Sequence, residues 1–480
     1  MRQRLTKSFS FFRSRLSDPG TEGGRSSERF RRIVLTTMSA SLARIIGLSA
    51  SLVSVPLTYR YLGGERYGIW MVLTSFIAVM AFADLGIGNG VVNAISEAYG
   101  RDDRQLAREY VTSAFVLLFA VGSVLGLVGT LAYPFIPWVR LFNVASHSAA
   151  SEGARAFLVL FYWFVVNIPL SVITRVQSGL QKAYWSQIVT ALGNILSLLG
   201  LLIVVAKHGS LAWLVFASTF GTIVATVLNG WLLFDRNPWL IPEWHDYRGD
   251  RAKRLLKLGI LFFVLQVAGA VGYTSDNIVI AQVLGASAVA VYAVPQKLFS
   301  FVSMIVSMGT GPLWPAYGEA MARGDAVWVR RCFWGSLRAS LAFSVPLCTI
   351  LAFAGPWLLR ITMGKSLHAP LSLLIVLGLW GIVASASQPM AMLLNGAGVL
   401  KEQAVVATVA SIANLLLSIF LTKRLGTIGV CLGSLFTQLA IVFPAGLFMI
   451  RKLFMRLDMS HTISDRNSVI PCQIGSGGGR

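Results

Sequence analysis

Long apolar stretches recur along the whole chain, and they constrain its fold more than any other feature. A helix needs about 20 consecutive apolar residues to cross a bilayer. Only 13% of the 480 residues are charged, whereas about a quarter are charged in a typical soluble protein. We therefore expect an all-α polytopic membrane protein. Twelve spans are predicted, near residues 33–56, 67–88, 110–133, 154–174, 186–206, 211–234, 258–284, 287–311, 334–354, 371–394, 404–421 and 428–450.

The distribution of Lys and Arg predicts the orientation of these spans. With twelve spans both termini lie on one side, and that side holds 30 of the 41 basic residues, against 9 on the other. Loops rich in Lys and Arg stay in the cytoplasm, so both termini are expected there. The same rule accounts for the net charge of +21, and no nucleic-acid partner is expected. The four cysteines form no CxxC pair, and neither a metal site nor a cofactor is expected.

The chain contains an internal repeat. Shifted by 222 residues, the segment 96–103 (SEAYGRDD) falls on 318–325 (GEAMARGD) without a gap, and four residues match. Further along, a shift of 220 brings Pro169 onto Pro389. Six helices per copy is an even number, so the two copies insert with the same orientation. The fold class that we predict is therefore two parallel six-helix repeats around a central cleft.

This repeat predicts how the chain is divided. The linker between the two copies carries Pro238, Pro242 and six basic residues, which suits two bundles that rock against each other. The five predicted parts are a basic cytoplasmic tail (1–32), an N-terminal bundle (33–234), a cytoplasmic linker (235–257), a C-terminal bundle (258–450) and a cytoplasmic tail (451–480).

One segment carries a family resemblance. In residues 56–103, an "LG...YG" motif opens span 2, a "DLG...N" motif closes it, and an acidic and basic turn follows. With the twelve spans and the duplication, this pattern closely resembles the O-antigen (Wzx-type) flippases of the multidrug/oligosaccharidyl-lipid/polysaccharide (MOP) superfamily. The resemblance implies a fold like that of the MATE transporters of the same superfamily.

The resemblance also implies a function. Members of the Wzx-type family flip undecaprenyl-diphosphate-linked oligosaccharide across the bacterial inner membrane for the assembly of O-antigen, capsule or exopolysaccharide. Alternating access between the two bundles is the implied mechanism. Besides this lipid-linked cargo, the implied partners are membrane lipids, a polysaccharide polymerase and glycosyltransferases.

Other functions share parts of this pattern. A cation-coupled multidrug exporter of the MATE type has the same fold, although cationic drugs favour acidic residues at the centre. A lipid II flippase is also similar but usually carries two more C-terminal helices. An enzyme acting on polyprenol-linked sugars would need acids and bases in sizeable loops outside the membrane. The loops expected here are short, so we do not predict an enzyme.

Ionisable residues inside the spans are the candidate site. Charges at membrane depth are expensive and usually line pathways. Arg44 lies near the middle of span 1, and Gln266 takes its place in the second copy. Lys297 lies mid-span in span 8, beside Gln296. We expect these four residues to line a basic central cavity and bind the diphosphate of a lipid-linked sugar.

Two acids could balance this charge. Asp276 lies in the outer half of span 7, and Asp84 lies about one turn from the cytoplasmic end of span 2. Either could bind a coupling ion or neutralise the cavity. The alternative is pairing within the bundles, of Arg44 with Asp84 and of Lys297 with Asp276.

Prolines and turn residues suggest moving parts. Proline kinks a membrane helix, so Pro169 and Pro389, which recur in both copies, are candidate hinges. In the cytoplasmic turns, the repeated pairs Glu97–Arg101 and Glu319–Arg323 would form salt bridges within each turn or a gate between the halves.

The stretch MAFADLGIGNGV (80–91) superficially resembles a phosphate-binding loop. A dinucleotide fingerprint follows a strand, whereas an apolar span precedes this stretch, and its third glycine comes too early. In the second copy, Gly309, Gly311 and Pro312 stand near the equivalent place. We expect these small residues to loosen the cytoplasmic ends of spans 2 and 8, while Asp84 has no acidic counterpart.

Overall fold

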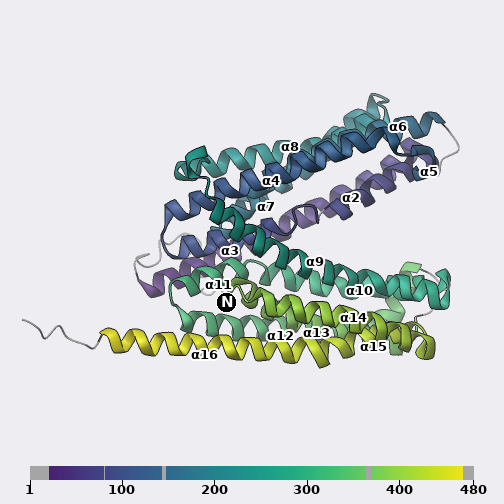
Figure 1. Ribbon diagram of the computed structural model, residues 1–480. Coiled ribbons are helices and arrows are strands. Elements are labelled where there is room, and N and C mark those ends of the chain that lie inside the picture. Colours follow the sequence, from purple (N-terminus) through teal and green to yellow (C-terminus); the bar gives the residue numbers. More distant parts are fainter. Residues whose placement is uncertain (1–20, 81, 143–146, 364–368, 469–480) are drawn as a thin grey trace, which may run out of the picture.

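The computed structural model describes residues 21–80, 82–142, 147–363 and 369–468, and these residues form two helical bundles joined at one end (Figure 1). Of the two predicted tails, residues 1–20 and 469–480 lie outside the described residues. The N-terminal half comprises α2 (Glu22–Met80), α3 (Ile87–Gly100), α4 (Arg104–Ala132), η1 (Tyr133–Phe135), α5 (Trp138–Phe142), α6 (His147–Gly179), α7 (Ala183–Ala206) and α8 (Leu211–Arg236).

A short linker with two 3-10 turns, η2 (Pro238–Leu240) and η3 (Trp244–Asp246), leads to the C-terminal half. The C-terminal half comprises α9 (Gly249–Leu284), α10 (Ala286–Thr310), α11 (Leu313–Ala322), α12 (Ala326–Met363), α13 (Leu371–Gly396), α14 (Leu400–Leu425), α15 (Thr427–Thr437), the π-helical turn η5 (Gln438–Val442) and α16 (Phe443–Ser468).

The helices are long and apolar enough for twelve membrane passes. Eleven stretches of the described chain meet the length and hydropathy of a span, and the first, Gly23–Phe76, is long enough for two. The all-α polytopic fold is therefore confirmed. Several helices run beyond their predicted ends: α2 begins at Glu22 rather than near residue 33, and α16 continues to Ser468.

Spans 1 and 2 are joined by a kink at one glycine. Gly63 has φ 69° and ψ 176° inside α2, and Gly285, between α9 and α10, has φ 91° and ψ 162°. The two glycines are 222 residues apart, the shift of the repeat. A positive φ is unfavourable for residues that carry a Cβ atom. Each copy thus turns from its first to its second span at the same glycine.

The packing within the two halves confirms the repeat. In each half the first helix packs on the fifth: α2 on α7 and α9 on α14. The third packs on the fourth in both, α4 on α6 and α12 on α13. Even the helix caps repeat, since Asp103 accepts a hydrogen bond from the Leu106 amide (2.9 Å) and Asp325 from the Trp328 amide (3.1 Å).

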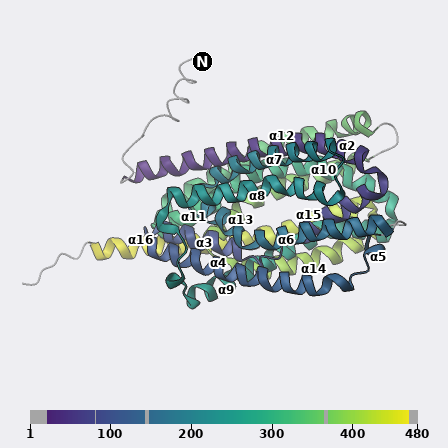
Figure 2. The ribbon, with the colours of Figure 1, turned by 90° about the horizontal axis from the view of Figure 1, so that it is seen from above.

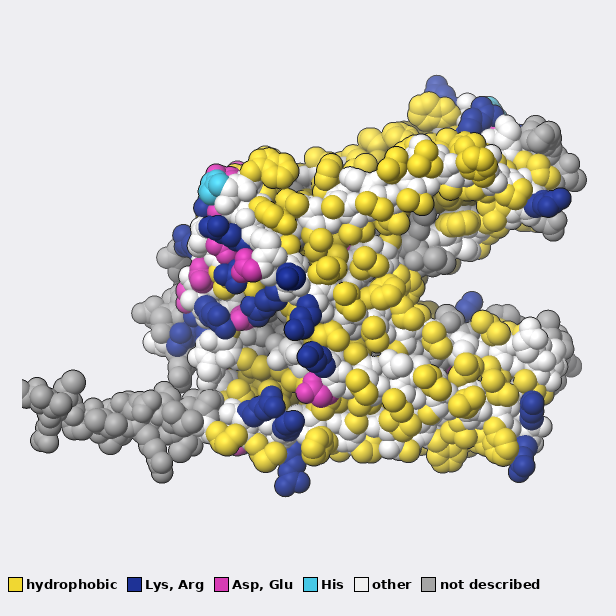
Figure 3. Space-filling view, viewed as in Figure 1, with side chains coloured by type: hydrophobic (Ala, Val, Ile, Leu, Met, Phe, Trp, Pro, Cys, Tyr) yellow, Lys and Arg dark blue, Asp and Glu magenta, His cyan; other side chains and the backbone are white. Residues whose placement is uncertain are grey.

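The two halves meet at one end and diverge at the other, which leaves a wide cleft between them. The space-filling view shows this cleft, open away from the end where most of the charged side chains gather (Figure 3). Seen from above, the helices of the two halves overlie one another (Figure 2). The closed end carries α3 and α11, the start of α2 and the start of α9 (Figure 1).

Candidate functional site

The halves are held together where α3 and α11 pack against each other. Gly318 abuts Ser96, and a Cβ atom built on Gly100 would lie 2.5 Å from that of Ala322. Each of these pairs is separated by 222 residues, so equivalent positions of the two copies are in contact. This α3–α11 contact therefore lies on the pseudo-twofold axis and closes one end of the cleft.

Ion pairs cross between the halves around this contact. Arg29, at the start of α2, bonds Glu319 of α11 at 2.5 Å, and both side chains are nearly buried, at 4% and 5% exposure. Arg254, at the start of α9, bonds Glu97 of α3 at 2.5 Å. In each case the first helix of one half pairs with an acid of the other half. We call Arg29–Glu319 and Arg254–Glu97 the crossed ion pairs.

The repeated turns take part as well. Arg101 bonds Glu97 and Arg323 bonds Glu319, each one turn apart, as the first of the two sequence interpretations expects. Arg323 also reaches Asp102 of the other half at 2.7 Å. This hydrogen bond lowers the pKa of the Asp102 carboxyl and raises that of the Arg323 guanidinium. The salt bridges within each turn are therefore present, and Arg323 also links the two halves.

A basic pocket lies at the floor of the cleft, between α2 and α10. Its volume is about 350 Å³. Two arginines, Arg32 and Arg175, line it, and among the described lining residues none is acidic. The other side chains that line it are Ile33, Thr36, Ala40, Val92, Ser178, Gln181, Ala183, Gln187, Ser307, Met308, Pro312, Trp314 and Pro315. We call this the cleft-floor pocket.

Arg175 is positioned by the motif that closes span 2. Its Nη1 donates to Asn89 Oδ1 at 2.8 Å, and its Nη2 lies 3.9 Å from Asp84 Oδ2. Asp84 is itself fixed, since its Oδ1 accepts the Gly86 amide at 2.9 Å. A Cβ atom on Gly88 would lie 2.7 Å from Asp84 Oδ2 and 2.8 Å from Arg175 Nε. The glycine thus leaves room for the arginine, whose side chain stays 38% exposed.

Sequence reasoning missed Arg175 because hydropathy ends span 4 at residue 174. In the structure α6 continues to Gly179, which brings this arginine to the cleft floor. The predicted pairing of Arg44 with Asp84 is wrong, since the partner of Asp84 is Arg175. The turn that holds Asp84 spans residues 82–86, whereas α10 and α11 are separated only at 311–312. The two breaks are therefore close but not equivalent.

Arg44 lies on α2 and Lys297 on α10, two helices that border the cleft-floor pocket. Thr37 of α2 donates to the Met308 carbonyl of α10 at 3.3 Å, so these helices touch at the floor. Ile33 and Met308 line the pocket, and Arg44 and Lys297 each lie eleven residues from one of them along the same helix. A step of eleven residues returns to within about 20° of the same helix face, about 16 Å along the axis. Both side chains are exposed.

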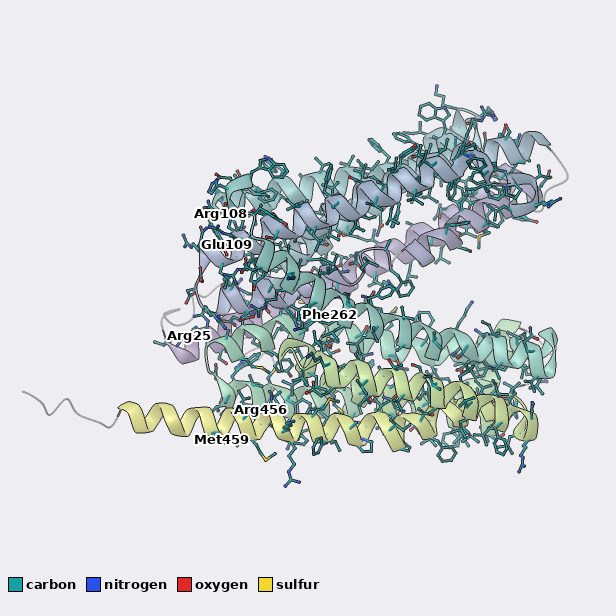
Figure 4. All side chains as sticks on the ribbon, in the orientation of Figure 1. Arg25, Arg108, Glu109, Phe262, Arg456 and Met459 are labelled. Atoms are coloured by element: carbon teal, nitrogen blue, oxygen red, sulfur yellow. The ribbon has the colours of Figure 1, made fainter. Side chains whose placement is uncertain are left out.

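The other predicted residues lie in both halves. Gln266 is half-buried and lies one turn beyond Phe262, which is labelled in Figure 4. The ring of Phe262 lies 5.2 Å from that of Trp314. Pro169 lies inside α6 and Pro389 inside α13, at repeat-related positions. Gln296 does not face the cleft-floor pocket but lines a different cavity.

That second cavity lies inside the C-terminal half and holds Asp276. Its volume is about 300 Å³, and we call it the C-half pocket. Asp276 is buried and accepts a hydrogen bond from Tyr292 at 2.7 Å, so its predicted pairing with Lys297 is wrong. Its Oδ1, and Oγ1 of Thr437, have no hydrogen-bond partner among the described residues. The polar side chains that line it are Asp276, Gln296, Trp380, Ser387, Gln388, Gln403, Ser411, Asn414, Ser434, Thr437 and Gln438.

Solved structures show which class of protein has this fold. A multidrug-resistance MATE transporter of the MOP superfamily, in an outward-facing conformation, superposes with a TM-score of 0.74 at 15% identity, over 90% of this chain and 97% of its own. A MATE in the bent conformation gives 0.77 at 14% identity and the same coverage. A MOP transporter of Pyrococcus furiosus, described as having a binding pocket of reversed polarity, gives 0.74 at 14% identity. The chain therefore has the fold of the MATE transporters, with two bundles around a cleft.

Sequence comparisons identify the family. The model of the polysaccharide biosynthesis protein family matches residues 33–321, and the chain belongs to that family. A candidate O-antigen transporter of Salmonella typhi is 25% identical over 61% of this chain and 66% of its own length. A candidate O-antigen export protein of Yersinia pseudotuberculosis is 23% identical over 77% of this chain and 84% of its own. The family resemblance seen in the sequence is thereby confirmed.

Proposed function

We propose that the chain translocates an undecaprenyl-diphosphate-linked oligosaccharide across the bacterial inner membrane for surface polysaccharide assembly, by alternating access. The observation that carries this proposal is the series of arginine and lysine side chains along the cleft. Arg32 and Arg175 line the cleft-floor pocket, and Arg44 and Lys297 are exposed on α2 and α10, the helices that border it. Its relatives are named for O-antigen transport and export, which fits this cargo.

A basic cleft suits a cargo of this chemistry. A diphosphate head must leave water to pass the membrane, and the free-energy cost falls when fixed guanidinium groups replace its hydration. Arg175 is pre-oriented by Asn89 and Asp84, so little order is lost when it binds an anion. The oligosaccharide would occupy the cleft, while the polyprenyl chain stays among the lipids.

In this proposal the closed end faces the cytoplasm. The end with the crossed ion pairs also carries the beginning of α2 and the end of α16 (Figure 1). The positive-inside rule assigns that end to the cytoplasm. The structure would then represent the state open to the periplasm, and loading from the inner leaflet requires the crossed ion pairs to open.

Asp276 is the candidate for coupling. A buried carboxylate with one orphaned oxygen, in a cavity that also holds the orphaned Oγ1 of Thr437, has the oxygen donors that a small cation or a proton requires. In the proposed function, ion entry into the C-half pocket biases the equilibrium between the two states. Asp276→Asn should abolish the dependence of transport on the ion gradient while leaving cargo binding in place.

The basic series is tested by neutralising one residue at a time. Arg175→Ala, Arg44→Ala and Lys297→Ala should each reduce surface polysaccharide about 10- to 100-fold in cells that lack the wild-type gene, because each removes charge-assisted hydrogen bonds. Arg331→Ala removes an exposed base outside the cleft and serves as the control. Normal polysaccharide in all three variants, at normal protein levels, would refute the proposal. Unchanged polysaccharide with a gain of drug sensitivity would favour a drug exporter.

A further inference from the structure

A second basic site lies on the outer surface, between α14 and α16. A groove of about 470 Å³ is lined there by Lys401, Lys452 and Arg456 together with Glu402. Its apolar lining residues are Val399, Val405, Val406, Ala445, Phe448, Met449 and Leu453. We call it the α14–α16 groove. It lies away from the cleft, because α16 lies on the side of the C-terminal half farthest from the N-terminal half (Figure 1). Val406 and Met449 line both this groove and the C-half pocket, so the two adjoin.

The charges and the apolar residues are arranged in order along both helices. On α16, Arg456 and Lys452 are followed one turn further into the bundle by Phe448, which is 67% exposed. On α14, Lys401 is followed one turn on by Val405, which is 65% exposed. Each helix therefore presents bases at the charged end of the molecule and exposed apolar side chains toward the hydrophobic middle.

The apolar path continues beyond the groove. Residues of α14 that repeat every three or four positions face outward along its whole length. They are Val405, Val409, Ile412, Leu416 and Phe420, all at least half exposed. A ligand that fits such a surface has an anionic head at one end and a long apolar chain at the other.

The three bases are available for such a head. Among the described residues, no acid lies within ion-pair distance of Lys401, Lys452 or Arg456, whereas Arg330 nearby is paired with Asp458. Glu402 reduces the net charge of the groove to +2. Figure 4 shows Arg456 and Met459 projecting from α16 near its charged end. Basic pockets between membrane helices at the cytoplasmic face are typical binding sites for anionic lipid heads.

We propose that the α14–α16 groove binds one anionic phospholipid of the inner leaflet, with its phosphate at Lys401, Lys452 and Arg456 and an acyl chain along Phe448 and Val405. The groove opens to the lipid and not to the cleft, so a bulk membrane lipid rather than the transported cargo is its occupant. The proposal does not depend on the nature of the cargo.

The test is lipid retention by the purified full-length protein. In native mass spectrometry with phosphatidylglycerol and phosphatidylethanolamine at equal amounts, we expect one phosphatidylglycerol to be retained selectively. Lys401→Gln/Lys452→Gln/Arg456→Gln should weaken its binding about 100-fold, since each base near an anionic lipid contributes roughly a factor of five. The control Lys253→Gln/Lys257→Gln/Arg331→Gln removes the same charge from exposed sites outside the groove and should retain the lipid.

A second variant tests the acyl part without changing charge. Val405→Trp should fill the groove and displace the lipid although all three bases remain. Equal loss in the groove and control triple variants would overturn the proposal, because a general surface charge would then be responsible. Displacement of the lipid by millimolar inorganic phosphate, or preference of the groove for a polyprenyl diphosphate over phosphatidylglycerol, would overturn it too.

Discussion

Arg175 depends on a neighbour that has no side chain. Its guanidinium lies between Asn89, Asp84 and the backbone of α3, and Gly88 provides the space. The three glycines of the GIGNG stretch (86–90) therefore have different structural roles. Gly86 and Gly90 pack on α9, whereas Gly88 faces the arginine.

This arrangement predicts unequal effects of two Gly→Ala substitutions. Gly88→Ala places a Cβ atom 2.7 Å from Asp84 Oδ2 and 2.8 Å from Arg175 Nε, so the arginine must move. We expect transport, measured as surface polysaccharide, to fall about tenfold or more, because a charge-assisted contact is lost. Gly309→Ala is the matched control, since nothing lies within 4 Å of the place that its Cβ atom would take.

Loss of helix stability would not explain a loss of transport in Gly88→Ala. Alanine favours a helix over glycine by roughly 1 kcal/mol, and both positions are helical. Gly309→Ala should therefore keep or raise the melting temperature and leave transport unchanged. Equal activity of the two variants would show that the position of Arg175 does not matter.

How far the sequence predicts the site is clearest at this scale. Hydropathy locates a charge within a span but not the turn at which a helix ends, so it places Arg175 in a loop. Hydropathy also does not identify the partner of a charged residue. In the sequence Arg29 is one of several bases in a basic tail, whereas in the structure it is buried against Glu319, 290 positions away. Ion pairs between the halves depend on how the helices are arranged in three dimensions, and hydrophobic periodicity does not predict that arrangement.

At the scale of elements, the chain uses the same joint twice. Spans 1 and 2 are joined at Gly63, and spans 7 and 8 at Gly285, both with positive φ and with nothing near the position of a Cβ atom. A substitution there meets no clash, so its cost is purely conformational. Twelve spans and their duplication are predictable because hydropathy and repeat matching are local properties, but the sequence alone does not single out these joints.

Gly63→Ala and Gly285→Ala should each lower the free energy of unfolding by about 1–2 kcal/mol, because alanine is strained at positive φ. The effects should add in the double variant, since the two joints lie in different halves. Thermal unfolding in detergent measures them. Gly64→Ala is the control: its surroundings are equally open, and its φ is not positive. A cost at Gly64 as large as at Gly63 would contradict this explanation.

At the scale of the whole molecule, the crossed ion pairs join the two halves at the closed end of the cleft. Glu319→Gln removes the buried ion pair with Arg29, which keeps Asp325 as a second partner at 2.7 Å. Glu319→Gln should therefore open the closed end. The distance between spin labels at Asp235→Cys and Arg331→Cys, one in each half, should increase in a background without the four native cysteines.

Glu28→Gln is the matched control for this experiment. Glu28 also bonds two arginines, Arg31 and Arg32, but both belong to its own helix. Its loss should leave the distance unchanged. An identical spectrum for Glu319→Gln and the unmodified protein would mean that packing of α3 on α11, and not charge, closes this end.

The pair Asp102–Arg323 sets the expected pH dependence. Because the hydrogen bond from Arg323 lowers the pKa of Asp102, the pair stabilises the closed end at every pH above the ordinary aspartate value of about 3.9. Its contribution is lost only as the pH falls through the lowered pKa. The same spin-label distance should therefore stay constant from about pH 5 to pH 8 and increase only in strong acid.

The α3–α11 contact has a consequence for the origin of the chain. In a twofold assembly only residues on the axis touch their own copies, and Gly100 meets Ala322 and Ser96 meets Gly318 in that way. The contact thus has the geometry of a homodimer interface, with both copies in one chain. The ancestor inferred from it is a six-helix protein that associated with itself through this face, and the linker later kept the partners at a high local concentration.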